Sequence, residues 1–401
     1  MEMNDEWAAR AAELLPTGAS TGSKRPEALY GTTEPAGPTH FVRAVGCRVE
    51  TTGGNELVDC TMALGAVAIG YGEPKIMGAV LETAAHGSVS GLSHVLEVEV
   101  AERFCNVVPC AERVQFLKTG AEAMSAAVRV ARAYTGRNVV VGSGYFGWHD
   151  WCSSQPGVPE SVRRDFHDVP FDDVQALESA VRDAGDQLAA IAIEPVVEHM
   201  ASPEWIARAR ALCDARGAAL IFDEMKTGFR LANGGYQEVS GVTPDLAAFG
   251  KALANGYPLA AVCGRAELLD CLKRTWISST LASEGTALAA AMGVLDWHEN
   301  VAVCDELARI GGEMRGLVSG ALKASGLGGI SVHGIDTMWF VKFESPEAER
   351  RFVSLAAEHG ALFKRGAYNF AALAHDEDAL VDIEAAASNA FVAMRQEQED
   401  A

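Results

Sequence analysis

The sequence lacks the features that bring a protein to a polyanion or a membrane. Its 401 residues contain 33 Lys and Arg against 54 Asp and Glu, a formal net charge of −21, and no basic patch offsets this excess. Phosphate backbones and anionic lipids repel such a chain, so we expect no nucleic-acid or membrane partner. No apolar run approaches the roughly 18–20 residues of a membrane span. The acidic N-terminal stretch, residues 1–15, also lacks the pattern of a secretory signal.

Metal-binding and disulfide patterns are missing as well. The nine cysteines are scattered along the chain without a C-x-x-C pair, and no Cys/His cluster has the spacing of metal ligands. We therefore expect reduced thiols, no bound metal, and a soluble protein in the cytoplasm. Because 49% of the residues are hydrophobic, a chain of this length is able to bury a large core and is expected to be globular.

The middle of the chain alternates short β-rich runs with helical stretches. The strand-like runs are Arg113–Leu117, Asn138–Gly142, Leu188–Glu194 and Ala218–Phe222, and the helical stretches are Glu122–Tyr134, Asp172–Ala184 and Pro203–Arg216. This rhythm predicts an α/β fold in which helices cover both faces of a mostly parallel sheet, with functional residues at the carboxyl ends of the strands. We expect an N-terminal segment over 1–48, a large α/β domain over 49–290 and a smaller α+β domain over 291–401.

Two apolar strands end in residues that carry chemistry. Leu220–Phe222 runs into Asp223, and Leu246–Phe249 runs through Gly250 into Lys251. Alone, the Asp-Glu pair at 223–224 would be interpreted as a pair of solvated loop acids, but a lysine at a second strand end favours a site. Burial lowers the pKa of a lysine and makes its neutral amine nucleophilic, as Schiff-base chemistry requires. The pair suits pyridoxal phosphate, with Lys251 bonded to its aldehyde carbon and Asp223 paired with the protonated pyridine nitrogen.

Three further segments have two interpretations each. One segment connects a strand to a helix and consists of Thr119, Gly120 and Ala121. It either presents the free N–H groups of the helix start to a phosphate or is a strand-to-helix connection without a binding role. Tyr145 belongs to an aromatic cluster that would either stack on the pyridine ring or fill the core. Glu194 lies at the end of a strand. It is either a carboxylate of the site or a structural acid whose hydrogen bonds are satisfied within the fold.

Taken together, these segments resemble the class III, fold-type I pyridoxal-phosphate aminotransferases, particularly the branch similar to glutamate-1-semialdehyde 2,1-aminomutase. The resemblance covers almost the whole chain. It rests on KTGAEAMSAAVRVARAYTGR, GYFGWHDW, AIEPV, FDEMKTGFR, GVTPDLAAFGKALANGYPLAAVCGR and ISSTLASEGTALAAA, among other segments. It implies a fold-type I architecture with a large cofactor-binding domain and a smaller C-terminal domain.

The resemblance also implies roles for single residues. Lys251 would be the Schiff-base lysine and proton shuttle, and Asp223 would lie on the ring nitrogen. Tyr145 would stack on one face of the ring, while Gly120 and Ala121 hold the phosphate.

Members of this family are homodimers with active sites at the interface. The resemblance implies that Thr280 reaches the phosphate of the other subunit's cofactor and that Met225 packs against the second face of the ring. Lys226 stands where relatives often have Gln or Met, either near the phenolic oxygen of the cofactor or pointing to solvent. Two further departures, Ala121 in place of threonine and Phe146 in place of histidine, leave the chemistry intact.

The reaction is predicted from a shortened segment. His149–Pro170 is much shorter than the corresponding region of the aminomutases, whose extra residues form a gate that retains the intermediate. We therefore expect an aminotransferase. The alternatives are a 2,1-aminomutase or epimerase, and a non-catalytic interaction module, which the presence of both Lys251 and Asp223 disfavours.

The substrates are predicted only as classes. We expect glutamate as amino donor, and its carboxylate needs a cation, for which the candidates are Lys24, Arg25, Arg230 and Arg365. The acidic composition suggests a cationic acceptor such as an amino-sugar, an aminocyclitol or another natural-product intermediate. Candidate contacts for such an acceptor are Asp150, Glu198, Glu284, Tyr368 and Asn369.

Overall fold

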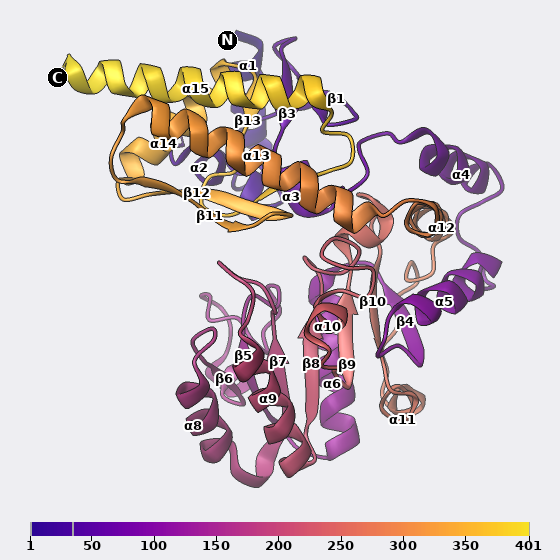
Figure 1. Cartoon of the computed structure of the whole chain (residues 1–401). Helices are drawn as coiled ribbons and strands as arrows, with labels where there is room; N and C mark the ends of the chain where they lie inside the picture. Colours follow the sequence, from indigo (N-terminus) through magenta and orange to yellow (C-terminus); the bar gives the residue numbers. More distant parts are fainter. Residues whose placement is uncertain (1, 34–35, 401) are drawn as a thin grey trace. The chain divides into compact units, whose positions relative to one another are not determined.

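The computed structural model describes residues 2–33 and 36–400 (Figure 1). The chain divides into two compact units, one made of residues up to Glu73 with those from Asp305 onward, and the other of Pro74–Cys304. This partition differs from the segments 1–48, 49–290 and 291–401 expected from the sequence, which stay a prediction. No described helix has the length and apolar character needed to cross a membrane.

The unit Pro74–Cys304 is built on a seven-stranded sheet of order β4-β10-β9-β8-β7-β5-β6. Its strands are β4 (Arg113–Leu117), β5 (Val139–Ser143), β6 (Phe166–Asp168), β7 (Leu188–Ile193), β8 (Ala219–Asp223), β9 (Leu246–Phe249) and β10 (Ala260–Gly264). Neighbouring strands from β6 to β9 pair in parallel, whereas β10 is antiparallel to both β9 and β4. The expected α/β fold with a mostly parallel sheet is confirmed.

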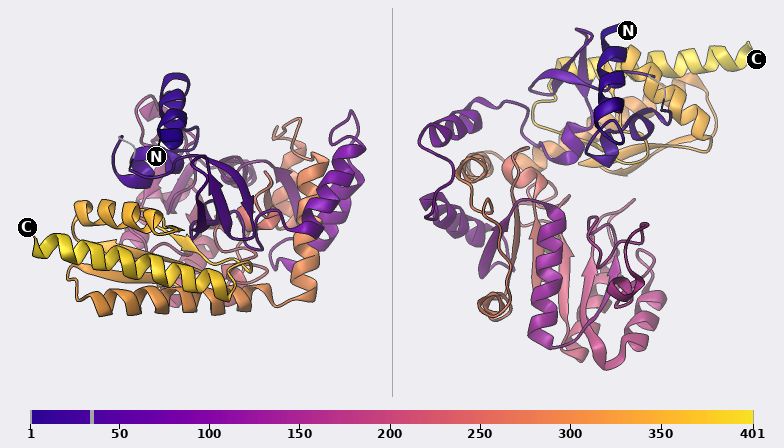
Figure 2. Two further views of the ribbon diagram at one scale, coloured as in Figure 1. Left: turned by 90° about the horizontal axis from the view of Figure 1, so that it is seen from above. Right: turned by 180° about the vertical axis from the view of Figure 1, so that it is seen from behind.

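Helices cover both faces of this sheet. Helix α6 (Gly120–Thr135) lies on one face, and α8 (Val174–Ala184) and α9 (Pro203–Arg216) lie on the other (Figures 1 and 2). The other elements of the unit are α4 (Pro74–Ala85), α5 (Val95–Val107), α7 (Glu160–Arg163), α10 (Tyr236–Ser240), α11 (Ala266–Leu269), α12 (Gly285–Asn300) and the 3-10 turns Gly185–Gln187, Lys251–Ala254 and Asp270–Lys273. Strands β4 and β9 and helix α9 have the bounds that the sequence predicts.

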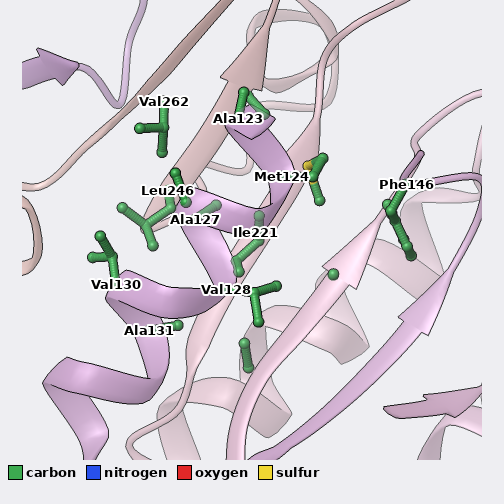
Figure 3. Close-up of a cluster of buried hydrophobic side chains, with 14 of the residues drawn as sticks. Ala123, Met124, Ala127, Val128, Val130, Ala131, Phe146, Ile221, Leu246 and Val262 are labelled. Carbon is green, nitrogen blue, oxygen red and sulfur yellow. The ribbon is translucent and has the colours of Figure 1, made fainter. Parts of the chain in front are cut away.

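Helix α6 begins two residues before the expected start at Glu122 because a capping box fixes its first turn. Thr119 Oγ1 accepts a hydrogen bond from the Glu122 N–H (3.3 Å), and the Glu122 carboxylate accepts one from the Thr119 N–H (2.8 Å). The two partners satisfy N–H groups that a helix start leaves unpaired. Alanines on the buried face of α6 allow it to lie close to the sheet (Figure 3). The core labelled there comprises Ala123, Met124, Ala127, Val128, Val130, Ala131, Phe146, Ile221, Leu246 and Val262.

The other unit contains two small sheets. The strand orders are β1-β2-β3-β13 and β11-β12-β14. Its strands are β1 (Phe41–Val45), β2 (Arg48–Thr51), β3 (Glu56–Asp59), β11 (Ile330–Ile335), β12 (Met338–Phe343), β13 (Ala361–Leu362) and β14 (Asn369–Phe370). Its helices are α1 (Glu2–Leu14), α2 (Pro26–Tyr30), α3 (Met62–Gly65), α14 (Pro346–Glu358), α15 (Glu377–Glu399), the 3-10 turn Gly22–Lys24 and α13 (Val303–Ser325), which begins just before the boundary between the units.

A buried glutamate anchors the turn that follows β8. Glu224 is fully buried and accepts hydrogen bonds from the N–H groups of Tyr236 (2.8 Å) and Gln237 (3.1 Å) and from the Thr227 hydroxyl. Asp223 is buried too, so the interpretation of this pair as solvated loop acids is wrong. The turn over 224–237 is therefore held against the strand end that carries Asp223.

We expect Glu224→Ala to lower the melting temperature by roughly 5–10 °C, since losing this acceptor leaves several buried donors unpaired at a cost of about 3 kcal/mol. Thermal unfolding followed by circular dichroism measures the change. Glu178→Ala is the control, because Glu178 pairs with Arg208 at the surface (2.6 Å), where ion pairs contribute less than about 1 kcal/mol. Equal shifts in the two variants would contradict an anchoring role for Glu224.

Candidate active site

Adjacent strands bring Asp223 and Lys251 to the same edge of the sheet. Asp223 is the last residue of β8 and pairs in register with Ala248 of β9, and the next N–H, of Glu224, donates to the Ala248 carbonyl (2.9 Å). Lys251 follows the end of β9 and has a φ of +46°, an uncommon value for a residue with a side chain. Such strain persists where the surrounding structure enforces it, and it clusters at functional sites.

Burial shifts both groups toward their neutral forms. It lowers the pKa of the Lys251 amine, and the positive charges of Lys226 and Arg230 act in the same direction, while Asp223 and Glu194 oppose them. Burial also raises the pKa of Asp223, with the negative charge of Glu194 adding to the effect. The Met225 N–H, which donates to Asp223 Oδ1 (3.0 Å), and the two lysines favour the ionised carboxylate. The site therefore holds an amine close to deprotonation beside a carboxyl group.

Glu194 links two other parts of the site. Its Oε1 lies 2.6 Å from Lys226 Nζ, and its Oε2 accepts a hydrogen bond from the Tyr145 N–H (3.0 Å). The side chains of Lys226 and Glu194 are only 10% and 11% exposed, so Lys226 does not point to solvent. Gly144 was not singled out in the sequence, yet a Cβ there would collide with the Glu194 side chain. The sequence signal for this close approach is a glycine that follows a strand and directly precedes Tyr145.

The aromatic cluster after β5 divides between core and surface. The Phe146 ring is buried against Trp151 and Phe166, as the core interpretation expects. Tyr145 is 73% exposed and Trp148 is equally so. Their rings therefore remain available for contacts outside the core.

The start of α6 provides a cradle for an anion. The N–H groups of Gly120 and Ala121 have no acceptor within the described part of the chain, and the Thr119 hydroxyl caps the helix. A Cβ at Gly120 would come within 2.9 Å of the Met225 sulfur, and one at Gly250 within 2.7 Å. Met225 thus lies between the helix start and the lysine strand. A buried amine, a buried carboxyl group and free helix-start amides fit pyridoxal phosphate.

The other residues expected at the site come from other segments of the chain. Thr280 is exposed in the loop before α12, and among residues 2–33 and 36–400 no hydrogen bond joins it to the cluster. Lys24, Arg25 and Arg365 belong to the other compact unit, where Arg365 pairs with Glu349 (3.2 Å). Their roles stay predictions.

Of the remaining candidates, two have clear structural roles. Glu284 caps α12 through the N–H groups of Thr286 (2.7 Å) and Ala287 (3.3 Å) and pairs with Lys118 (3.2 Å). Asn369 is buried, and its Oδ1 accepts a hydrogen bond from the Lys364 N–H (2.8 Å). Arg230 is fully buried, and burial lowers its pKa to about 10.

We expect Lys251 to react with acetic anhydride at unusually low pH in the full chain without cofactor. Only the neutral amine reacts, so a lowered pKa moves the rise in labelling to lower pH, with a midpoint of about 8 against about 10.4 for ordinary lysines. Mass spectrometry of the peptides measures labelling, with the exposed Lys273 as internal standard. A midpoint for Lys251 at or above that of Lys273 would contradict the electrostatic account of the site.

Comparison with known proteins identifies the family. The model of the class-III aminotransferases matches residues 31–373. The chain is 32% identical to the 3-aminobutyryl-CoA aminotransferase of Cloacimonas acidaminovorans (strain Evry), over 84% of this chain and 83% of that protein. It is 29% identical to the glutamate-1-semialdehyde 2,1-aminomutase of Polynucleobacter necessarius subsp. necessarius (strain STIR1), over 98% and 99%.

Among solved structures, the internal aldimine form of the FumI protein of Sphingopyxis sp. MTA144 superposes with a TM-score of 0.94 at 24% identity, covering 100% of this chain and 98% of that one. The fold is therefore that of the fold-type I enzymes, and the resemblance seen in the sequence motifs is confirmed. The cofactor of this family is pyridoxal 5'-phosphate. The chain belongs to the class-III aminotransferase family and is a PLP-dependent transaminase.

Proposed function

We propose that the chain transfers the amino group of glutamate to the carbonyl carbon of a second small molecule, with Lys251 and Asp223 as its catalytic residues. One observation carries the proposal: the buried Asp223 ends β8, and Lys251, whose amine is buried, follows the end of the adjacent strand β9. The bound cofactor supplies an electron sink for the pair released when the Cα–H bond of the substrate breaks.

The chain's own residues then have distinct tasks. The Lys251 amine, kept near its neutral form by burial, takes the proton from the substrate Cα and would deliver it to the carbon of the cofactor's aldehyde group. The Asp223 carboxylate holds a proton at the pyridine nitrogen. Gly120 and Ala121 donate their N–H groups to the phosphate, supported by the positive end of the α6 dipole.

Further side chains orient the ring and exclude water. In this proposal Tyr145 covers one face of the ring and Met225 the other, and Glu194 fixes Tyr145 through its backbone N–H. Lys24, Arg25 and Arg365 are the proposed partners of the donor carboxylate. The proposed acceptor class, an amino-sugar, aminocyclitol or related biosynthetic intermediate, is supported by the net charge of −21, which attracts cations.

The second candidate is a 2,1-aminomutase. The relative from Polynucleobacter necessarius carries that name and matches 98% of this chain. Transamination is preferred because residues 149–170 form only turns, the short helix α7 and the short strand β6. A segment of this length is too short to form the additional loop that would retain an intermediate in the site.

We also propose a homodimer. Large hydrophobic side chains are exposed along α4, α5 and the loop between them, and such patches mark interaction surfaces. They are Met77, Leu81, Val89, Leu92, Val95 and Val98. Thr280 lies between the exposed Trp276 and Leu281, which supports its proposed contact with the cofactor phosphate of the partner subunit.

Glutamate is expected to convert the bound cofactor to its amine form in a single turnover and to release one equivalent of 2-oxoglutarate. Absorbance spectroscopy and enzymatic detection of 2-oxoglutarate measure the two products. Lys251→Ala is expected to lower the steady-state rate at least about 10³-fold, because it removes the group that moves the proton. Lys273→Ala, at an exposed position on the same unit, is the control.

Two results separate the alternatives. Glutamate 1-semialdehyde consumed at a constant rate without any amino donor would support the aminomutase and reject the transaminase. Normal turnover of Lys251→Ala would refute the assignment of this lysine, whatever the substrate.

Leu92→Glu is expected to weaken the proposed dimer at least tenfold, since burying a carboxylate in an apolar interface costs more than about 1.4 kcal/mol. Sedimentation velocity across a concentration series measures the dissociation constant. Val381→Glu on α15, also an exposed apolar position, is the control. A monomer in the unmodified protein, or equal dissociation constants in both variants, would reject this interface.

A further inference from the structure

A pocket of about 280 Å³ lies between helix α6 and the segment that follows strand β5. Its polar lining consists of Ser125, Arg129 and Arg132 from α6 and of His149 and Asp150 from the segment. All of these residues belong to the compact unit Pro74–Cys304. None of them has a catalytic role in the proposed reaction, so the polar groups of the pocket need an explanation of their own.

The two arginines of the pocket keep their positive charges unpaired. They are neighbours on one face of α6, since they stand three residues apart. Arg129 Nη1 donates to the Trp276 carbonyl (2.8 Å), and Arg132 Nε donates to the Asn138 carbonyl (2.8 Å). Within residues 2–33 and 36–400 neither arginine forms an ion pair with a carboxylate, and Arg132 Nη2 is buried without a hydrogen-bond partner. An unpaired buried donor is costly, and an anion in the pocket would satisfy it.

A chain of hydrogen bonds sets the proton of the His149 ring. An indole N–H can only donate, so the Trp151 Nε1–H donates to Ser125 Oγ (2.9 Å). The Ser125 hydroxyl has no other acceptor in the described part of the chain, so it donates its own proton to His149 Nδ1, which lies 2.6 Å away. The neutral ring then carries its proton on Nε2. Because His149 lines the pocket, this N–H is a third donor beside the two guanidinium groups.

Two carboxylates act against these donors. Asp150 lines the pocket but is exposed, so water screens its charge. Burial lowers the pKa of Arg132, and the negative charge of Asp165 opposes this effect. The Asp165 carboxylate, however, lies 3.6 Å from Arg164 Nε. Since a guanidinium stays protonated in proteins, the lining has two cations against one carboxylate, within a chain whose net charge is −21.

We propose that this pocket binds a phosphate group, as inorganic phosphate or as a small phosphate monoester, held by Arg129, Arg132 and the Nε2–H of His149. A phosphate accepts several hydrogen bonds at once, and the planar guanidinium matches its oxygens in pairs. Pockets for drug-sized ligands occupy roughly 300–1,000 Å³, so a volume of about 280 Å³ has room for only a small ester group. The site is separate from the proposed reaction, in which the cofactor phosphate is held by Gly120 and Ala121.

Isothermal titration calorimetry of the cofactor-loaded full chain tests this site, with inorganic phosphate and glycerol 3-phosphate as separate probes at constant ionic strength. The loaded protein is used because the phosphate of the cofactor then occupies the start of α6. Arg129→Gln and Arg132→Gln are each expected to weaken binding at least about tenfold, because each removes a charged donor. Asp150→Asn is expected to strengthen binding severalfold, because it removes the carboxylate of the lining, which repels a phosphate.

The matched control is Arg182→Gln, at an exposed position on α8, which lies on the other face of the sheet from α6. Its loss is expected to leave both affinities unchanged. Circular dichroism verifies that each variant is folded. If Arg132→Gln fails to fold, the variants at the exposed positions Arg129 and Asp150 still decide the sign of the effect. Tighter binding of glycerol 3-phosphate would identify an ester as the ligand, and tighter binding of inorganic phosphate would identify the free ion.

Two results would overturn the proposal. One is the absence of saturable binding of both probes to the parent protein, or affinities that do not change in the folded arginine variants. The other is weaker binding in Asp150→Asn, which a purely structural role of the lining, or a cationic ligand, would produce. Because the measurement is of binding and not of turnover, rejection of the transaminase reaction would leave these results unchanged.

Discussion

The packing of a lysine into the interior, at the carboxyl end of β9, is the constraint on which the rest of the site depends. A buried ammonium is costly in free energy unless it loses its proton or meets a carboxylate. The parallel register of β8 and β9 supplies the carboxylate, because it sets Asp223 beside Ala248. Asp223 stays buried only if the turn that follows β8 is itself held against the strand end. The hydrogen bonds that the Tyr236 and Gln237 N–H groups donate to Glu224 hold this turn there. The chemistry and the stability of this edge thus share the same contacts.

Close approach of backbone segments is the second requirement, and it explains where glycine is needed. Met225 fits between the start of α6 and the end of β9 only because positions 120 and 250 carry no Cβ. Gly147 has a φ of +97°, and a Cβ there would lie 2.5 Å from that of Ala121. The loop bearing Tyr145 therefore packs directly onto the helix start. The small side chain of Ala121 is compatible with this tight contact.

Features of the fold that depend on residues close together in the chain, such as the ends of a helix, are predicted correctly from the sequence. Helix α9 is bounded by the Ser202 cap, Pro203 and Gly217, which has left-handed φ, and its expected limits are correct. Asp223 and Lys251 were found because each ends an apolar strand. The partner of Lys226 was not predicted, because Glu194 lies on a different strand and only the sheet order brings them together. The roles proposed for Thr280 and for the cations that would bind the donor carboxylate came from the resemblance or from residue type alone, because no local pattern in the sequence marks them.

The net charge of the chain does not describe the charge around Lys251. The chain carries −21 overall, yet the charged groups that act on Lys251 are two cations, Lys226 and Arg230, and two carboxylates, of which Glu194 is one and Asp223, shifted by burial toward its neutral form, is the other. Surface charges are screened by water and salt over about 10 Å, whereas buried charges interact at lower effective dielectric. The local balance is therefore set by the strand ends and not by the composition. A phosphate ester brings about two negative charges, so an interior without the chain's excess of negative charge, beside free helix-start amides, favours its binding even within an acidic protein.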